Sequence, residues 1–275
     1  MKVTTLIDNS KGVTGLTNEW GLSLYVEAGN QKVLFDSGTS SAFARNAEKL
    51  SLDLSEVNLA ILSHGHFDHG GGLGAFFSAN KTAPLYLRTT ADGDHYGKFL
   101  FWSRYVGIDR TLLRTNQRRL HWVEKDIEVA PGLHLLTSIP DDEHRPDTRR
   151  RLVVRTEHGF ASDAFKHELV LVVKERDGIS VVTGCGHLGV LNMILAAKMK
   201  FPEARIKTVI GGFHMIAAPI TRRKAEAMAL ALRFKELGCQ RVVSGHCTGS
   251  KALSVLEREL GDTFSRLTTG SSFEV

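Results

Sequence analysis

Residues 63–72 read Ser-His-Gly-His-Phe-Asp-His-Gly-Gly-Gly, and four of these side chains are of kinds that bind metals. Imidazole and carboxylate groups are common ligands of zinc, iron and manganese. Alternate side chains of an extended backbone point to the same side, so His64 and His66 can face one metal. Asp68 and His69 come after a turn and can face a second one. Histidines in a glycine-rich turn can also be solvated, but this set of ligands directly after an apolar run favours a metal site.

Three later histidines stand at similar places in the chain. His187, His214 and His246 each follow an apolar, strand-like run and a glycine-bearing turn. Ligands gather where a strand gives way to a helix in layered α/β folds. The recurrence therefore predicts that these histidines and the loop at 64–69 meet at one edge of the sheets.

The His-x-His-x-Asp-His pattern at 64–69 resembles the signature of the metallo-β-lactamase-fold superfamily. Three further motifs, at 183–187, 211–214 and 245–249, resemble the branch of dihydropterin-ribofuranosylaminobenzene-phosphate-synthase-like metal-dependent hydrolases. The resemblance implies an α/β fold of the four-layer αββα sandwich type, with residues 1–275 as a single domain.

The resemblance also implies which residues hold metals. The expected ligands form two sets: His64, His66 and His187 for a first metal, and Asp68, His69 and His246 for a second. Asp36 matches an aspartate that supports the metal loop in the superfamily, where such a carboxylate orients a ligating imidazole. An Asp-Ser-Gly sequence is also a common turn, so both readings of Asp36 stay open.

One departure from the superfamily concerns the number of metals. Many members have an aspartate that bridges two metals after a strand-end glycine, whereas the corresponding position here is Cys185. Cys185 is either a thiolate ligand or a small packed residue. His214 and Asp68 are the expected catalytic residues, with His214 in contact with the substrate. Cys247 is expected to be structural, because on a strand it would point away from its neighbouring histidine.

The apolar pattern weakens between residues 88 and 151, where arginines alternate with aromatic residues. We interpret this segment as a partly helical insertion or cap that covers the active site and holds an anionic, ring-bearing substrate. A solvated connecting segment fits the sequence equally well. His95 and His144 are the histidines of this region best placed to face a substrate, since loops over a site carry function.

No histidine in or just after this segment has a ligand-like companion at close spacing, so each alone is expected to be a surface or packed residue. These histidines are His95, His121, His134, His144, His158 and His167. Asp163 and the pair His167-Glu168 are weak candidates for the rim of the site. Elsewhere, helical spacing predicts a helix at 40–50 with Ser41 as its N-cap, and a helix capped by Thr221.

Composition limits the class of protein. The 275 residues carry a net charge of +5 with a pI near 9.1, and 42% of them are hydrophobic. Dispersed basic residues favour an anionic ligand but not nucleic acid. Three cysteines, two of them in glycine-flanked motifs, indicate reduced thiols and a cytoplasmic protein. No stretch approaches the roughly 20 apolar residues of a membrane span.

These observations predict an enzyme, a metal-dependent hydrolase with one or two divalent transition metals. Zinc is the first expectation, with iron or manganese as alternatives. A metal-activated water would attack a small, anionic ester, lactone or phosphoester, and the branch implies a pterin-related or phosphorylated one. The alternative is a non-enzymatic, metal-containing ligand-binding or regulatory protein of the same fold. Exposed aromatic residues in the insertion would serve a homodimer.

Overall fold

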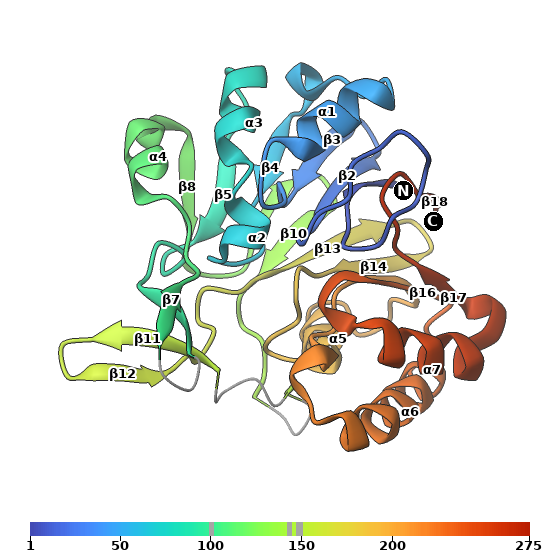
Figure 1. The fold of residues 1–275 in the computed structure, drawn as a ribbon. Coiled ribbons are helices and arrows are strands. Elements are labelled where there is room, and N and C mark those ends of the chain that lie inside the picture. Colours follow the sequence, from blue (N-terminus) through green and yellow to red (C-terminus); the bar gives the residue numbers. More distant parts are fainter. Residues whose placement is uncertain (99–101, 142–144, 147–150) are drawn as a thin grey trace. The chain divides into compact units, whose positions relative to one another are not determined.

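The computed structural model describes residues 1–98, 102–141, 145–146 and 151–275 (Figure 1). The chain forms two compact units. The first comprises residues 1–124, 148–168 and 268–274, and the second comprises residues 125–147 and 169–267 with Val275. His144, expected to face the substrate, lies outside the described residues, as does part of the predicted cap at 88–151.

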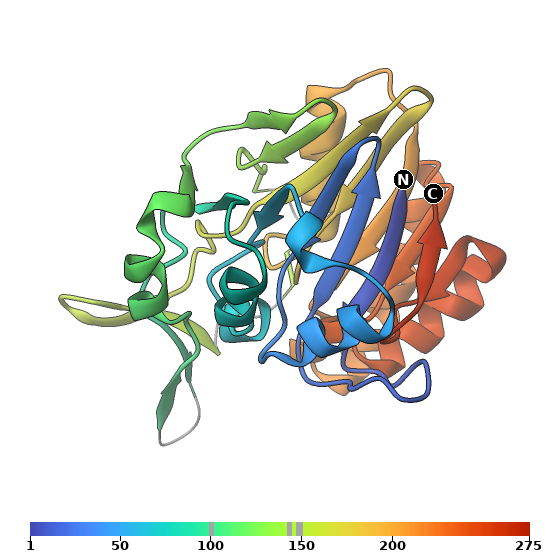
Figure 2. The ribbon, with the colours of Figure 1, turned by 90° about the horizontal axis from the view of Figure 1, so that it is seen from above.

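The first unit contains a seven-stranded sheet of order β18-β1-β2-β3-β4-β5-β8. Its strands are β1 (Lys2–Ile7), β2 (Ser23–Ala28), β3 (Gln31–Phe35), β4 (Leu59–Ile61), β5 (Leu85–Arg88), β8 (Leu120–Val123) and β18 (Ser272–Glu274). Figure 2 shows the blue strands β1 to β3 side by side. The strands from β3 to β8 are parallel, so β3 and β4 end at the same edge of the sheet.

The helices of the first unit each come after a strand in the chain. They are α1 (Ala42–Lys49), α2 (Phe67–Gly70), α3 (Leu73–Ala79) and α4 (Arg110–Thr115). Phe43 of α1 and Phe76 of α3 are fully buried in one apolar cluster with the sheet. Each such side chain contributes about 1.5–3 kcal/mol by leaving water. The packing of these helices therefore stabilises the sheet from which the loop at 64–69 continues.

The predicted N-cap of the first helix is correct in position but not in chemistry. Ser41 is the N-cap residue of α1, yet its side chain makes no capping hydrogen bond. Its φ and ψ of −72° and 5° depart from the extended conformation that capping requires. The Oγ of Ser40 accepts the hydrogen bond from the amide of Ala42 instead, at 3.1 Å.

A separate four-stranded sheet in the first unit has the order β12-β11-β6-β7. Its strands are β6 (His95–Lys98), β7 (Ser103–Tyr105), β11 (Leu152–Thr156) and β12 (Gly159–Ser162). Tyr96 and Tyr105 pack across β6 and β7 with ring centroids 5.5 Å apart. Within its described residues, the segment 88–151 thus contains the helix α4 but mostly strands. Its coverage of an active site stays a prediction.

The second unit contains another seven-stranded sheet, of order β17-β16-β15-β14-β13-β10-β9. Its strands are β9 (Ile127–Ala130), β10 (Leu133–Leu136), β13 (Val170–Glu175), β14 (Gly178–Val182), β15 (Ile206–Gly211), β16 (Arg241–Ser244) and β17 (Phe264–Arg266). The predicted hairpin of β13 and β14 is confirmed. From β14 to β17 all pairs are parallel, so the ends of these strands lie along one edge.

Helices α5 (Val190–Lys200), α6 (Ile220–Glu236) and α7 (Ser250–Leu260) belong to the same unit. Short 3-10 segments also occur in the chain: η1 (Leu54–Glu56), η2 (Gln117–Arg119), η3 (Met215–Ala217), η4 (His246–Thr248) and η5 (Gly261–Thr263). The prediction that Thr221 caps a helix is wrong, because α6 already begins after Pro219, whose ring fixes the entry into the helix.

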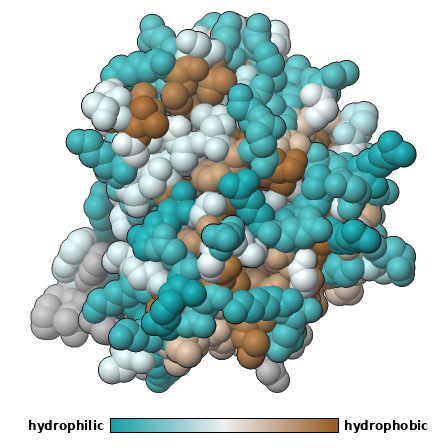
Figure 3. All heavy atoms as spheres, turned by 90° about the vertical axis from the view of Figure 1, so that its right-hand side faces the viewer, coloured by the Kyte–Doolittle hydropathy of each residue, from teal (hydrophilic) through white to brown (hydrophobic). Residues whose placement is uncertain are grey.

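The surface is mostly hydrophilic on the face drawn in Figure 3. Hydrophobic side chains there occur in small, separate groups. Leu232 of α6 is one hydrophobic residue that stays exposed, at 57%. Among the described residues, no helix has the length and apolarity to cross a membrane.

Candidate metal centre

The predicted metal loop follows β4 and is buried. His64, His66, Asp68 and His69 are each less than 10% exposed, so they are not solvated turn residues. The ring centroid of His64 lies 4.6 Å from that of His66 and 4.1 Å from that of His69. The loop brings three imidazoles and a carboxylate together within the first unit.

Glycine is required inside this loop at position 65. A Cβ there would lie 2.1 Å from the carbonyl oxygen of Ala91, which no ordinary contact allows. The amide of Gly65 donates to His167 Nδ1 at 3.0 Å. The backbone between the two histidines of the loop is therefore held by close packing on one side and by a hydrogen bond on the other.

Asp36 lies at the end of β3, beside the parallel strand that delivers the loop. Its Oδ1 accepts the amide of Ser63 at 2.7 Å, and its Oδ2 accepts the hydroxyl of Ser63 at 2.7 Å and lies 2.6 Å from His69 Nδ1. The Ser63 Oγ lies 2.8 Å from His64 Nδ1. Because a carboxylate only accepts, His69 carries its proton on Nδ1, and the same logic applies to His64 through the serine. Asp36 thus sets the Nε2 atoms of two candidate ligands as the metal-facing nitrogens.

Asp68 is oriented by a residue that the sequence did not single out. The indole Nε1 of Trp20 donates to Asp68 Oδ2 at 2.9 Å. The same carboxylate oxygen lies 3.8 Å from His69 Nε2, so the two ligand atoms point into one space. Trp20 stands in a polar loop without periodicity, and only its contact with Asp68 reveals its role.

A second group of polar residues surrounds His66. One nitrogen or oxygen from each of His66, His95, Asp163 and His167 lies within 4.8 Å of the others, and all four residues are buried. We name these residues the histidine–aspartate cluster. Asp163 and His167 are therefore interior residues rather than parts of an exposed rim. Sequence reasoning missed the cluster because its members are far apart in the chain and have no short-range spacing.

Hydrogen bonds among Asp163, His95 and His167 favour a positioning role for these three residues over a ligand role. Asp163 Oδ2 lies 3.1 Å from both His95 Nδ1 and His167 Nε2, and Oδ1 accepts the amide of Phe165 at 2.6 Å. The other nitrogen of His95 faces the carbonyl of Thr90 at 3.3 Å. Both nitrogens of His95 therefore lie near oxygen atoms of the protein, and the ring is packed inside the first unit. That it faces a substrate stays a prediction.

Burial shapes the protonation of the cluster. Burial, together with the neighbouring His167 and His95, holds the pKa of His66 well below its usual value. Burial also lowers the pKa of His167. For Asp163, burial raises the pKa, but the hydrogen bonds from His167 and His95 outweigh it and hold the pKa below its usual range. A neutral His66 keeps the lone pair that a metal ligand needs.

In the second unit, the ends of β14, β15 and β16 supply another set of candidate ligands. Cys185, His214 and Cys247 each offer a sulfur or nitrogen atom within 4.8 Å of the others, and we name them the thiol cluster. His246 Nε2 lies 3.3 Å from the Sγ of Cys185, and the ring of His187 lies 4.2 Å from that of His214, centroid to centroid. Every histidine predicted from strand ends in this unit is thus near another predicted residue.

The expected direction of Cys247 is wrong, because the backbone there is not a strand. Residues 246–248 form the 3-10 turn η4, and His246 has a φ of +47°. His214 has a φ of +45° and Asp36 a φ of +59°. Such conformations of non-glycine residues cost about 1–3 kcal/mol and tend to occur at functional sites. Side-chain alternation, which presumes an extended chain, therefore does not apply.

Two of the three buried thiols, one on each side of β16 in the chain, differ in environment. Burial raises the pKa of Cys247, but Cys185, His246 and His214 beside it hold that pKa well below its ordinary value. Burial raises the pKa of Cys239 to about 12. A lowered pKa favours the thiolate, which is the form that binds metals.

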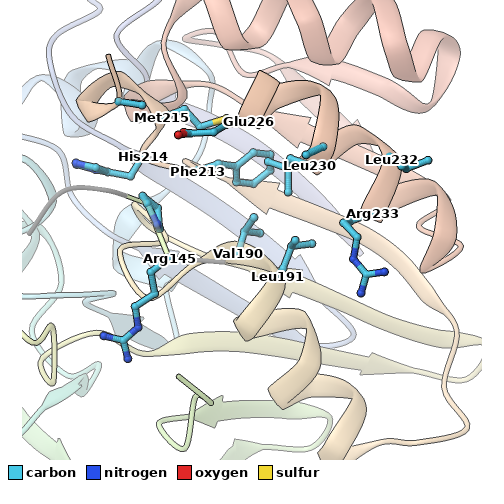
Figure 4. Close-up of a pocket in the computed structure, with 13 residues that line it drawn as sticks. Arg145, Val190, Leu191, Phe213, His214, Met215, Glu226, Leu230, Leu232 and Arg233 are labelled. Atoms are coloured by element: carbon cyan, nitrogen blue, oxygen red, sulfur yellow. The ribbon is translucent and has the colours of Figure 1, made fainter. Parts of the chain in front are cut away.

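A cavity of about 380 Å³ adjoins His214 in the second unit. Its walls include Val190, Leu191, Phe213 and Leu230, and Figure 4 shows the Phe213 ring among these apolar side chains. The lining is completed by Arg145, Pro146, Met215, Ala218, Glu226, Ala229, Leu232 and Arg233. Arg145 pairs with Asp141 and Arg233 pairs with Glu236. The cavity thus offers an apolar surface beside a predicted catalytic histidine.

Comparison with known proteins supports the fold and family that the sequence motifs predict. Residues 21–189 match the sequence model of the Metallo-beta-lactamase superfamily. A solved structure described as a metal-dependent hydrolase of the beta-lactamase superfamily is 31% identical, with a TM-score of 0.84 over 100% of this chain and 99% of that chain. Zn²⁺-bound PqqB from Methylobacterium extorquens is 11% identical, with a TM-score of 0.57 over 100% of both chains, which shows a shared fold.

A further relative from Methanocaldococcus jannaschii is 28% identical over 283 aligned residues. The alignment spans 98% of this chain and 95% of the relative, which is named 7,8-dihydropterin-6-methyl-4-(beta-D-ribofuranosyl)-aminobenzene-5'-phosphate synthase.

Proposed function

Because the chain belongs to the metallo-beta-lactamase superfamily, we propose that it is a metal-dependent hydrolase of a small ester, lactone or phosphoester. The predicted α/β fold class and family resemblance are confirmed. The substrate and the identity of the metal belong to the proposal.

The buried metal loop with its anchor Asp36 is the observation that supports this proposal most. Two imidazoles have their Nδ1 atoms held by Asp36, one directly at 2.6 Å and one through Ser63. Fixing the tautomer of a ligating histidine in this way is how metalloproteins set ligand basicity. These hydrogen bonds leave the Nε2 atoms of both rings as the nitrogens that a metal would bind.

The proposed ligands are the two sets that the family resemblance implies: His64, His66 and His187, and Asp68, His69 and His246. Their donor types, five imidazoles and one carboxylate, suit zinc, iron or manganese. A divalent metal bound there supplies a water of lowered pKa and polarises the substrate oxygen. Asp68, which accepts a hydrogen bond from Trp20, would hold the proton of such a water.

The substrate is proposed to be small and anionic. The relative from Methanocaldococcus jannaschii is named for a phosphorylated pterin derivative, which supports a pterin-related or phosphorylated substrate. The apolar cavity beside His214 is suited to a ring or another apolar group of such a molecule. His214 would contact the substrate from the edge of this cavity.

The first test is a metal assay combined with a hydrolysis screen. We expect at least about one equivalent of a transition metal per chain, and hydrolysis of a chromogenic phosphodiester, ester or lactone that a chelator abolishes. His66→Ala should lower kcat/KM by about 1000-fold or more, because it removes a ligand of the activating metal. His158→Ala, which changes an exposed histidine of the same unit, should leave the rate unchanged.

Activity that survives His66→Ala would show that the reaction is not centred on this metal. A protein with bound metal but no hydrolysis of any substrate class would support the alternative function, a metal-containing ligand-binding or regulatory protein. Ligand binding that depends on the metal would then be its measurable activity.

A further inference from the structure

We propose that Cys185, His214 and Cys247, the thiol cluster, form a thiolate-containing transition-metal site within the second unit. The metal would be a borderline or soft ion such as Zn²⁺, since thiolate ligands select zinc and copper(I) over magnesium, calcium and manganese. This site goes beyond the proposed function, because none of its three residues is among the six proposed ligands of the two metals.

The sheet explains why these three residues meet. Strands β14, β15 and β16 are neighbours and run parallel. Cys185 follows β14, His214 follows β15 and Cys247 follows β16, each by only a few residues. The carboxyl ends of parallel strands share one edge, so the topology itself delivers one ligand from each of three consecutive strands.

The backbone is shaped to bring the thiol of Cys247 inward. A Cβ on Gly212 would lie 2.5 Å from the Sγ of Cys247 and 2.8 Å from the carbonyl oxygen of Gly184. Only glycine leaves this space open. The left-handed backbone of His246, at a φ of +47°, then turns Cys247 toward Cys185 rather than away from it.

The distances agree with coordination of one ion. Zinc bonds are about 2.3 Å to sulfur and 2.0–2.1 Å to nitrogen, so two ligands of one tetrahedral ion lie roughly 3.5–4 Å apart. The three ligand atoms of the thiol cluster all lie within 4.8 Å of one another, and both thiols are at most 2% exposed. His214 Nδ1 is buried and has no hydrogen-bond partner among the described residues.

His246, a proposed ligand of the second metal, lies beside the thiol cluster, with its Nε2 3.3 Å from the Sγ of Cys185. Two thiols and one imidazole leave one position of a tetrahedral ion for an exogenous ligand. Both cysteines would bind as thiolates, so binding would form two metal–sulfur bonds and release to the solvent any proton that either thiol still carries.

The same chain contains a matched control for the thiol cluster. Cys239 is also buried, at 7% exposure, and lies just past the end of α6. It belongs to none of the groups of potential ligands found among the described residues. Replacing it tests the loss of a buried thiol without touching the proposed site.

The experiment is cobalt substitution of the full chain, because thiolate–Co²⁺ bonds give intense charge-transfer absorption in the near ultraviolet. We expect this absorption in the wild type, in Cys239→Ser and in a triple variant with His64, His66 and His69 each changed to Ala. Cys247→Ser should lose about half of it and bind Co²⁺ at least 10–100-fold more weakly, as loss of even an outer partner does at metal sites. Cys185→Ser/Cys247→Ser should lose it completely.

The absence of thiolate absorption from the wild type, or its persistence in the double cysteine variant, would overturn the proposal. X-ray absorption at the zinc edge of the wild type needs no variant and covers the case of a variant that does not fold. Zinc at the proposed imidazole and carboxylate ligands adds nitrogen and oxygen scatterers to the average signal. A sulfur shell at about 2.3 Å within that average supports the site, and a shell of only nitrogen and oxygen refutes it. Hydrolysis is read out separately, so failure of the hydrolase proposal would leave the thiolate signal in place.

Discussion

The histidine–aspartate cluster and the thiol cluster are both buried, but their polar atoms are organised differently. In the first, Asp163 bonds two imidazoles, and one of these rings also bonds the backbone of the metal loop. In the second, sulfur and nitrogen atoms from three strand ends converge around Cys247. Hydrogen bonds that use up ring nitrogens hold a loop in place, whereas converging soft donors are suited to an ion. Proximity alone therefore does not distinguish a support from a ligand site.

Loss of the carboxylate anchor should have the largest effect. Asp36→Ala leaves the amide and hydroxyl of Ser63 and the Nδ1 of His69 without their acceptor in a buried place. Each stranded donor costs about 1–3 kcal/mol, so the free energy of unfolding should fall by about 3 kcal/mol or more. Denaturant unfolding measures this change.

The anchor also tests whether the metal loop and the thiol cluster are independent. Asp36→Ala should lower hydrolysis by at least about 10–100-fold through the misoriented imidazoles, while the thiolate absorption of the cobalt-substituted protein stays. Asp36→Asn keeps the shape but can no longer accept on both sides, so its rate should lie between those of the wild type and Asp36→Ala. An equal loss of both signals would show that the metal loop and the thiol cluster are one site.

Crowding the thiol cluster should have the next largest effect. Gly212→Ala places a methyl group against the Sγ of Cys247, and such overpacking costs about 1–3 kcal/mol. We expect weaker thiolate absorption together with this loss of stability. Gly15→Ala also changes a loop glycine, whose φ of +88° strains an alanine, but nothing lies near its Cβ position. This control should lose some stability while the absorption is unchanged. An unaltered spectrum in Gly212→Ala would argue that Cys247 is not a ligand.

Acid should weaken the histidine–aspartate cluster of the metal-free protein. The pKa values of His66 and His167 are lowered from 6.5 in the folded state, chiefly by burial. As the pH falls below 6.5, the unfolded chain takes up protons that the folded chain does not, so stability is lost in that direction. Denaturant midpoints at pH 7.5 and pH 5.5 should show the decrease. A midpoint that rises on acidification would contradict a neutral, buried His66.

The smallest effect is expected at Trp20, which is 48% exposed. Trp20→Phe removes the hydrogen bond to Asp68 Oδ2 but keeps an aromatic ring. The loss should be about 0.5–1.5 kcal/mol in the interaction with Asp68, seen as up to a tenfold decrease in kcat with little change in unfolding. If kcat is unchanged, Asp68 is held by the loop itself and Trp20 is dispensable.

Local features could be predicted from the sequence wherever a single strand end carried its own motif. The metal loop at 64–69, the glycine-flanked His187, His214 and His246, and the hairpin of β13 and β14 follow from short-range patterns. Spacing in the chain determines these features, because alternation along a strand and glycine at a turn are properties of neighbouring residues.

Tertiary structure alone decided which distant side chains meet. Asp163 and His167 meet His66 across about a hundred residues, and Cys247 joins Cys185 through parallel strands and the left-handed turn at His246. No local spacing predicts these contacts, since they depend on strand order and on backbone angles that the residue types disfavour. The sequence by itself determined the family and the metal loop, whereas the packing of the sheets decided which residues support the loop and which gather as a set of thiol and imidazole donors.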